Sequence, residues 1–401
     1  MEMNKSLLRG SFVLLVAFGI YNFLNSVFQL SMARMLSITD YSILATIFSF
    51  IYILSVFTES IQLIISKYTT NENDKGKLKN ILKKSLKKSF LISSLVFLIY
   101  LILAIYLSDL LKIGYLLLGV SGVIIFSSFL LPITRGIMQG KKRFKSLGVN
   151  MISESSIKII FAFLFVFFGF RVYGVIIGVI IGFIVSFVFS FYSVKDILIV
   201  KEKVVKTIGI YNYAKPAFFI TLVIIIFYSI DIVIARIVFS PEISGMYAIA
   251  SILSKSIFWG TNPISKAMFP LSAEKNINDK KSKNVFLNAS LILIALIVVA
   301  LFLFYFYSSF IVQIFSGKVI LEAASILFYL GLGTSIISLT NLILVYKLSL
   351  GKIKGYYYLF IFVIIEVLLL FYFSHNLIEF SIAFVTASSI FLFGSIFLMN
   401  D

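Results

Sequence analysis

The sequence has no cysteine and a single histidine, His375, which narrows the chemistry that the chain can perform. Without cysteine there can be no disulfide framework, no thiolate metal site and no cysteine nucleophile. One histidine also leaves little for a metal centre or for a histidine proton relay. We therefore expect no enzyme activity, no metal and no bound cofactor, while coupling to Na⁺ or H⁺ stays open.

Charged residues are scarce as well, at 13% of the chain against 60% hydrophobic residues. A soluble domain of this composition would expose far too much apolar surface to water. The apolar residues gather in long runs, and the first, residues 7–30, is long enough to span a bilayer and lacks a following cleavage pattern. The composition therefore predicts a multi-pass membrane protein.

The apolar runs predict an all-α fold with twelve transmembrane helices, because a bilayer core needs about 20 apolar residues per helix. The runs are too long and continuous for the strands of a membrane barrel. The predicted helices cover residues 7–30, 41–66, 89–107, 115–137, 149–169, 172–194, 211–236, 243–263, 285–310, 320–346, 356–374 and 378–398.

The basic residues alternate between the connections of these helices. Most of the 35 Lys and Arg residues lie on the N-terminus and on every second connection. The opposite connections hold only Arg34, Lys112, Arg171, Arg236 and Lys318. The positive-inside rule then places both termini in the cytosol. The net charge of +18 comes from these basic connections, which face the anionic headgroups of the membrane. Nucleic acid is therefore not an expected partner.

An internal repeat divides the chain into two halves. Residues 33–36 match residues 235–238, and SITDYSILA (37–45) lines up with SPEISGMYA (240–248). Both copies follow a helix that starts on the cytosolic side. We therefore expect two parallel six-helix bundles, residues 1–200 and 201–401, related by an axis along the membrane normal.

Polar residues recur every three or four positions on several predicted helices, which places them on single faces. The residues of these faces are Asn22, Asn25 and Gln29; Ser42, Thr46, Ser49, Tyr52, Ser55, Glu59, Gln62 and Ser66; Tyr228 and Asp231; and Ser244, Tyr247, Ser251, Lys255 and Asn262. Isolated serines can simply join helices by hydrogen bonds. Buried ionisable groups instead mark pathways or pairs. We expect a hydrated cavity walled by helices 7–30, 41–66, 211–236 and 243–263.

Two pairs of opposite charges lie at membrane depth. Glu154 and Lys158 are four residues apart with the acid first, a spacing that favours an ion pair within one helix over contact with a substrate. Asp231 and Lys255 lie on adjacent helices and either pair with each other or leave Lys255 for an anionic substrate. Glu366 has no partner visible in the sequence.

Three arginines lie near predicted helix ends. Arg34 and Arg236 are at outward ends, and Arg135 is near an inner end. Their long side chains can reach the headgroups, which is the expected arrangement unless they contact a substrate.

Several of these features together resemble the polysaccharide-exporter branch of the multidrug/oligosaccharidyl-lipid/polysaccharide (MOP) superfamily. They are Tyr213-Ala214-Lys215-Pro216 opening a helix, Asp231 late in it, SPEISGMYA after it, and the early ARMLSITDYSILA. The chain departs from the branch at Tyr41-Ser42, where the branch has an aromatic residue followed by glycine. The resemblance implies a flippase of the cytoplasmic membrane that moves polyprenyl-phosphate- or diphosphate-linked oligosaccharides by alternating access.

Under this resemblance the predicted site takes specific roles. The partners are the lipid-linked glycan and membrane lipids, and we expect a monomer. The candidate residues are Lys255, Arg236, Arg34 and Arg135 for phosphate; Tyr52, Tyr228, Tyr247 and Trp259 for sugar faces; Asn22 and Asn25 for the polar wall; and Glu59, Asp231, Glu154 and Lys158 for ion coupling or ion pairs.

Two other functions compete with the flippase. A cation-coupled multidrug antiporter of the same superfamily would use Glu59 and Asp231 to exchange ions for organic cations. A membrane glycan polymerase or glycosyltransferase would need a sizeable outer loop with carboxylates or histidine, and the outer connections here are short.

Overall fold

The computed structural model describes residues 5–70, 72–204, 211–273, 279–352 and 354–399. Throughout these ranges the regular structure is helical and contains no strand, which confirms the predicted all-α fold. Each of the twelve predicted segments falls on a helix or on a pair of consecutive helices. Within the described residues, nine helical segments are long and apolar enough to cross a membrane, and the shorter helical segment Tyr356–Tyr372 is also apolar. The count of twelve spans stays a prediction, and both chain ends lie outside the described residues.

The helices form two compact units that share one long helix. The first unit contains residues 1–36 and 54–210, and the second contains residues 37–53 and 211–401. Helix α2 (Ile38–Thr70) contributes its first half to the second unit and its second half to the first unit. The predicted division at residue 200 differs from these units by the segments 37–53 and 201–210 and stays a prediction.

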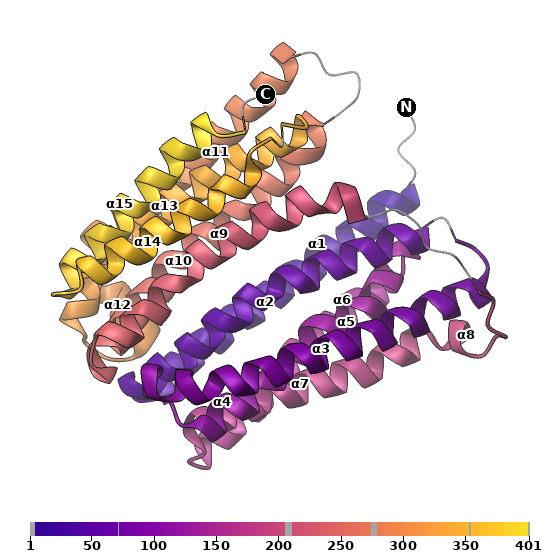
Figure 1. Ribbon diagram of the computed structural model, residues 1–401, viewed down its shortest axis with the longest axis horizontal. Helices are drawn as coiled ribbons and strands as arrows, with labels where there is room; N and C mark the ends of the chain where they lie inside the picture. The colour runs from indigo at the N-terminus through magenta and orange to yellow at the C-terminus, as the bar shows by residue number, and fades with distance from the viewer. Residues whose placement is uncertain (1–4, 71, 205–210, 274–278, 353, 400–401) are drawn as a thin grey trace. The chain divides into compact units, whose positions relative to one another are not determined.

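The first unit is built on α1 and on the helices that follow α2 (Figure 1). These helices are α1 (Lys5–Met35), α3 (Lys75–Leu111), α4 (Tyr115–Gly122), α5 (Ile124–Gly140), α6 (Phe144–Phe167), α7 (Arg171–Ser193) and α8 (Lys195–Leu198). Within this unit α6 packs against both α1 and α7, and α5 packs against α3, α6 and α7.

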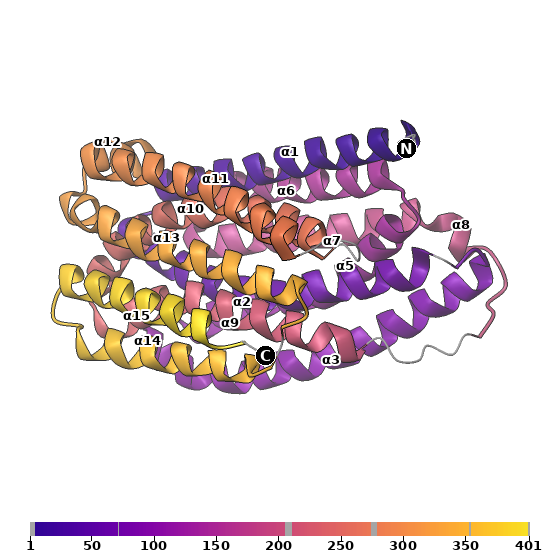
Figure 2. The same ribbon diagram turned by 90° about the horizontal axis from the view of Figure 1, so that it is seen from above.

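The second unit holds the remaining helices. They are α9 (Tyr211–Val238), α10 (Pro241–Ser272), α11 (Asp279–Phe306), α12 (Ser308–Ser316), α13 (Leu321–Ser349), the 3₁₀ turn η1 (Tyr356–Leu359), α14 (Phe360–Tyr372) and α15 (Leu377–Phe397). Helix α13 packs against α10 and α15, and α14 lies beside α15 (Figure 2).

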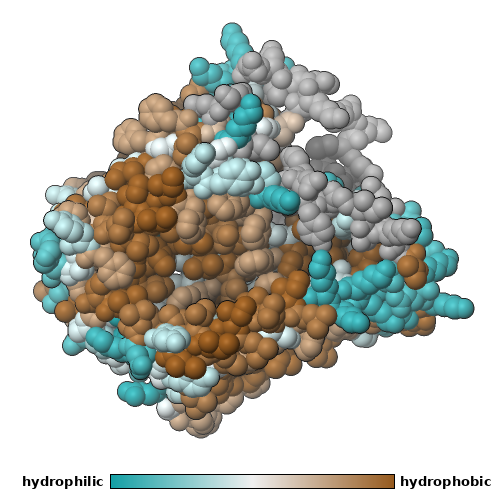
Figure 3. Space-filling model, viewed as in Figure 1, coloured by the Kyte–Doolittle hydropathy of each residue, from teal (hydrophilic) through white to brown (hydrophobic). Residues whose placement is uncertain are grey.

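Large hydrophobic side chains cover the outside of several helices, and Figure 3 shows them as a broad apolar surface. Helix α11 exposes a long run of them, including Leu291, Val298 and Phe302. An apolar outer surface of this kind suits lipid and not water. The protein is therefore a multi-pass membrane protein, in agreement with the composition.

The two copies of the repeat begin their helices in the same way. Ser37 accepts a hydrogen bond from the backbone N–H of Asp40 at 3.0 Å, and Ser240 accepts one from Ile243 at 3.3 Å. Both serines thus occupy the N-cap position. The starts of the two helices also touch, because a Cβ on Gly245 would lie 2.3 Å from the Ile38 carbonyl oxygen. This close approach explains why the first half of α2 belongs to the second unit.

Helix α3 begins at Lys75, well before the predicted span at 89, because Asp74 caps it by accepting hydrogen bonds from Gly76 and Lys77.

The segment after α7 is held near the start of α3 by ion pairs of Asp196. The Arg143 guanidinium bonds both Asp196 carboxylate oxygens, at 2.7 and 2.8 Å, and Lys75 lies 3.1 Å from Asp196. The hydrogen bonds from Arg143 lower the pKa of Asp196 to about 2.

We expect Asp196→Asn to loosen this segment, since the bidentate ion pair is lost. Hydrogen–deuterium exchange of residues 195–200 should rise at pH 7. A carboxylate whose pKa is lowered by folding stabilises the fold above its unfolded pKa of about 4, and this contribution disappears as the pH falls toward 2. The difference between the variant and the parent chain should therefore disappear across that range. Equal exchange at pH 7 would contradict the role of the ion pair.

Lys347 near the end of α13 holds the end of α15. Its ammonium donates to the carbonyl oxygens of Ser395, Ile396 and Leu398 at 2.9, 2.6 and 2.6 Å. The last carbonyls of a helix have no partner within it, so these bonds satisfy groups that would otherwise be left unpaired.

Lys347→Met should therefore destabilise the protein by about 1.5–3 kcal/mol, the range for hydrogen bonds that involve a charged group. The measurement is the thermal unfolding midpoint of the purified protein in detergent. Lys354→Met is the matched control, because Lys354 is exposed on the following connection. A midpoint equal to that of the control would show that the cap contributes nothing.

Candidate functional site

Each unit contains a cluster of buried and half-buried polar side chains. The first-unit cluster consists of Arg135, Asn150, Glu154 and Ser186, with Lys158 and Asn25 beside it. The second-unit cluster consists of Asp231, Tyr247, Ser251 and Lys255. Each cluster is described within its own unit.

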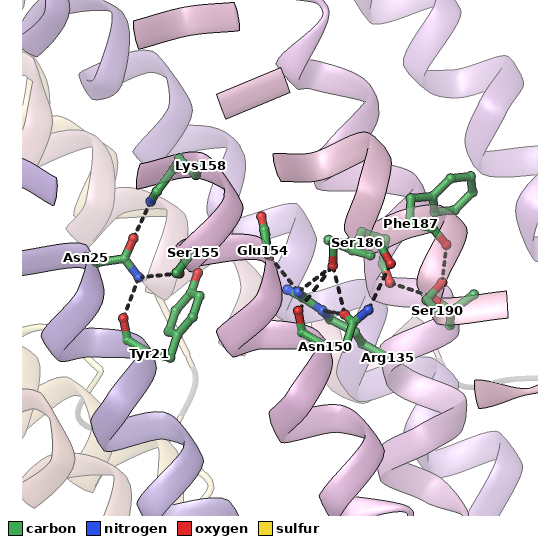
Figure 4. A network of polar contacts seen from close by, with 12 residues as sticks. Tyr21, Asn25, Arg135, Asn150, Glu154, Ser155, Lys158, Ser186, Phe187 and Ser190 are labelled. Carbon is green, nitrogen blue, oxygen red and sulfur yellow. Dashed lines mark hydrogen bonds and ion pairs between the residues drawn. The ribbon is translucent and has the colours of Figure 1, made fainter. Parts of the chain in front are cut away.

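Arg135 on α5 is the centre of the first-unit cluster (Figure 4). Its Nε donates to Asn150 Oδ1 at 2.8 Å, and its Nη2 donates to Glu154 Oε2 at 2.6 Å and to Ser186 Oγ at 3.3 Å. Asn150 in turn donates to the Ser186 carbonyl at 2.8 Å. Only 6% of Arg135 is exposed. The expectation that Arg135 reaches for headgroups is therefore wrong, because three side chains on α6 and α7 hold its guanidinium inside the unit.

The predicted ion pair within α6 is also corrected. Glu154 pairs with Arg135 at 2.6 Å and not with Lys158. The spacing rule considers neighbours on one helix, whereas the buried guanidinium of α5 presents a planar fork that suits a carboxylate better than a flexible ammonium does. The pairing of α5 with α6 therefore decides which cation Glu154 takes.

Lys158 has neutral partners instead. Its ammonium donates to Asn25 Oδ1 and lies 4.5 Å from the centre of the Phe28 ring. Asn25 is held in turn by bonds from its Nδ2 to the Tyr21 carbonyl at 2.9 Å and to Ser155 Oγ at 3.4 Å (Figure 4). Among the described carboxylates, none forms an ion pair with Lys158. Within the described residues, the direct partners of this lysine are therefore neutral.

In the second-unit cluster, by contrast, the two opposite charges of Asp231 and Lys255 are paired with each other. Asp231 is 0% exposed and accepts three hydrogen bonds, which come from Lys255 at 2.7 Å, Tyr247 at 3.0 Å and Ser251 at 2.7 Å. The three donors are four residues apart on α10, so they lie on one face of that helix. Lys255 also lies 4.9 Å from the centre of the Tyr228 ring. Of the two alternatives that the sequence leaves open, the structure shows the Asp231–Lys255 pair.

Arg236 is buried, which corrects the expectation that it reaches for headgroups. Only 1% of it is exposed, and its Nη1 donates to Ser42 Oγ at 3.2 Å and to Ser244 Oγ at 3.4 Å. The two hydroxyl oxygens are 2.7 Å apart. The guanidinium therefore joins the starts of α2 and α10 inside the second unit.

The other predicted site residues differ in accessibility. Trp259 is 45% exposed and lies 6.2 Å from the half-buried Tyr52 ring and 6.1 Å from the Tyr228 ring. Tyr228 and Tyr247 are buried, so neither ring presents a free face for a sugar in this structure. Three further residues, Asn22, Arg34 and Glu59, are exposed and belong to neither cluster as defined.

Sequence reasoning missed Asn150 and Ser186. A signal for Asn150 was present, since Asn150, Glu154 and Lys158 are spaced four residues apart and share one face of α6. Ser186 gave no such signal, because a lone serine in an apolar helix is common.

Glu366 on α14 is a buried acid outside both clusters. It is 0% exposed, and neither of its carboxyl oxygens has a hydrogen-bond partner in the described structure. A buried polar group left unpaired costs about 1–3 kcal/mol. Such a group is retained either at the expense of stability or for a function.

We expect Glu366→Met to raise the thermal unfolding midpoint, since it removes the unpaired carboxyl and fills a similar volume. Glu322→Met is the control, because Glu322 is exposed. A stabilised variant that no longer transports would assign Glu366 a functional role. A lower midpoint would mean that the carboxyl is well accommodated.

Comparison with solved structures places this fold among transporters. An inward-facing multidrug resistance transporter of the MATE family in the MOP superfamily matches with a TM-score of 0.71 at 15% identity, covering 96% of this chain and 98% of the other. The lipid II flippase MurJ in an inward closed conformation gives 0.66 at 19% identity, covering 96% and 87%. A MOP superfamily transporter from Pyrococcus furiosus gives 0.56 at 14% identity, covering 98% and 95%.

The structure therefore has the fold of these MOP superfamily transporters. Residues 7–276 match the sequence model of a family described as polysaccharide biosynthesis protein. The chain belongs to this family, since the match covers more than half of its length. No curated protein sequence matches it.

Proposed function

We propose that the protein translocates polyprenyl-phosphate- or diphosphate-linked oligosaccharides across the cytoplasmic membrane by alternating access, for the assembly of a surface glycan. The family and the fold shared with a lipid II flippase support this proposal. The substrate class combines an acidic, polar head with an apolar tail. A transporter for it needs a cation at membrane depth that the protein has not already neutralised.

The proposal rests mainly on the neutral partners of Lys158. A charged residue within a membrane helix costs about 2.5–3.5 kcal/mol on insertion scales, and such residues mark pairs or transport pathways. Lys255 is already paired with Asp231, whereas Lys158 is held by an amide and an aromatic ring. We therefore assign the phosphate contact to Lys158 in preference to Lys255. Its neutral partners can be exchanged for a phosphate without leaving a carboxylate unpaired.

The accessible aromatic residues suit the sugars. Trp259 and Tyr52 lie next to each other and are at least partly exposed. Aromatic rings offer an apolar face that packs on the C–H face of a sugar ring. We assign them the glycan contact within the second unit.

A flipping assay tests the function. The protein is reconstituted into vesicles that carry a fluorescent disaccharide on a short polyprenyl diphosphate in both leaflets, and a membrane-impermeant reagent quenches the outer leaflet. We expect the quenched fraction to rise from about half toward completion in the presence of protein. The matched control is a fluorescent phosphatidylcholine, which carries no glycan and should not be flipped. A chain that leaves both probes in place would contradict the proposal.

A cation-coupled multidrug antiporter is the second candidate, and Glu366 is the observation that favours it. A buried carboxyl without a partner is a suitable place for H⁺ or Na⁺. Asp231 favours it less, because Lys255 already occupies that carboxylate. The same vesicles, loaded with ethidium under an imposed pH or Na⁺ gradient, distinguish the two functions. Gradient-driven ethidium movement without glycolipid flipping would favour the antiporter.

A further inference from the structure

The second unit contains a groove of about 460 Å³ where α9 ends and where α10, α13 and α15 begin. All of the residues that line it belong to this one unit, and none belongs to the second-unit cluster. The apolar lining residues are Phe239, Ile243, Met246, Leu377 and Ile378, and the polar ones are Glu322, Ser325, His375 and Asn376.

Glu322 gives the groove a negative charge that no lining Lys or Arg offsets. Its carboxylate has no ion pair and no hydrogen bond in the part of the chain that the structure describes, and Ser325 Oγ donates to its backbone carbonyl instead, at 2.8 Å. The first turn of α13 favours a negative charge at this position. His375 already has an acidic partner, since its Nδ1 lies 3.1 Å from Glu379 Oε2. The groove therefore offers a carboxylate that still lacks a cation.

The groove lies at the level where lipid headgroups are expected. Tyr372 and Phe373, which directly precede the lining segment before α15, are exposed, and exposed aromatic side chains gather at the boundary between hydrocarbon and headgroups. Ile243 and Ile378 in the groove wall are also exposed, so this wall is open to a lipid chain. The charge alternation of the sequence predicts that this end of the helices faces away from the cytosol.

An unpaired carboxylate beside an open apolar wall suits a ligand with a cationic head and an apolar tail. An anionic lipid fits less well, because Glu322 would repel its net negative charge. An ethanolamine ammonium can donate charge-assisted hydrogen bonds to a carboxylate, which are roughly twice as strong as neutral ones. A choline headgroup carries the same charge but has no N–H group to donate.

We propose that this groove binds a phosphatidylethanolamine of the leaflet that faces away from the cytosol. Its ammonium lies against the Glu322 carboxylate, and one acyl chain lies along Ile243 and Ile378. His375 and Asn376, the lining side chains with N–H groups, face its phosphate. The bound lipid joins the starts of α10, α13 and α15.

Native mass spectrometry of the full chain, released from detergent with phosphatidylethanolamine or phosphatidylglycerol, tests the site. We expect Glu322→Gln to weaken phosphatidylethanolamine binding about fivefold, which corresponds to about 1 kcal/mol, the upper end for a solvent-accessible ion pair. Glu242→Gln is the matched control and should leave the binding unchanged, because Glu242 is exposed at the start of α10 and does not line the groove. Equal binding by the two variants would overturn the proposal.

Two further arms identify the ligand. Ile243→Trp fills the groove at an exposed position and should reduce phosphatidylethanolamine binding while Glu322 stays in place. In the parent chain, phosphatidylethanolamine should bind more tightly than phosphatidylglycerol and phosphatidylcholine. Equal binding of phosphatidylglycerol would show that the headgroup charge is not recognised, and equal binding of phosphatidylcholine would show that the ammonium N–H groups are not. Either result would overturn the proposal.

Discussion

Asp231→Asn should destabilise the folded protein by about 3–5 kcal/mol, because it leaves the Lys255 ammonium buried without its counter-charge. Lys255 is 4% exposed and cannot reach water without a rearrangement of α10. Asparagine keeps the shape of the side chain and can still accept from Ser251 or Tyr247, so the loss reports the charge and not a cavity. The measurement is the thermal unfolding midpoint in detergent, with Asp109→Asn on the exposed end of α3 as the control.

The double variant Asp231→Asn/Lys255→Met separates pairing from packing. Removing both charges leaves no unpaired ion, and replacing a buried pair by groups of similar volume is often neutral or stabilising. We therefore expect the double variant to be more stable than Asp231→Asn alone, with strong non-additivity between the two changes. Losses that simply add would show that the two charges do not stabilise each other.

The sequence predicts much of this fold because its strongest signals are local. Apolar runs and alternating basic connections locate the helices, and the alignment of the two copies pairs Ser37 with Ser240, which the structure shows capping α2 and α10. The sequence left two alternatives for Lys255, a pair with Asp231 on the adjacent helix or contact with an anionic substrate. The choice between them needed the positions of Tyr247 and Ser251, which complete the carboxylate's hydrogen bonds.

The partners of Glu154 and Arg135 could not be predicted because they depend on how closely three helices approach. A Cβ on Gly182 would lie 2.9 Å from the Glu154 carbonyl oxygen, and one on Gly178 would lie 2.5 Å from the Ala162 nitrogen. These two glycines let α7 pack directly on α6, and that contact brings Ser186 next to Asn150. A sequence shows the glycines but not which helix they face.

The two clusters therefore differ in the partners that a substrate phosphate would have to displace from the charged side chains. The second-unit cluster is closed, because each of its charges has an opposite charge within the protein. In the first-unit cluster Arg135 satisfies Glu154, and Lys158 is left with neutral partners. A substrate phosphate that reached Lys158 would replace an amide and would separate no ion pair. This difference in electrostatic state is the reason to test Lys158 first.

Lys158→Met should reduce the flipping rate of the polyprenyl diphosphate probe about 10- to 100-fold, because a hydrogen bond between two charged groups is worth about 1.5–3 kcal/mol and each 1.4 kcal/mol is a factor of ten. The same change should leave the thermal unfolding midpoint nearly unchanged, since Asn25 and Phe28 are neutral and no buried charge loses its partner. Lys158→Arg, which keeps the charge, should retain most of the activity. A Lys158→Met protein that is stable and flips at the parent rate would remove Lys158 from the pathway, and one that unfolds would show that the lysine serves the fold.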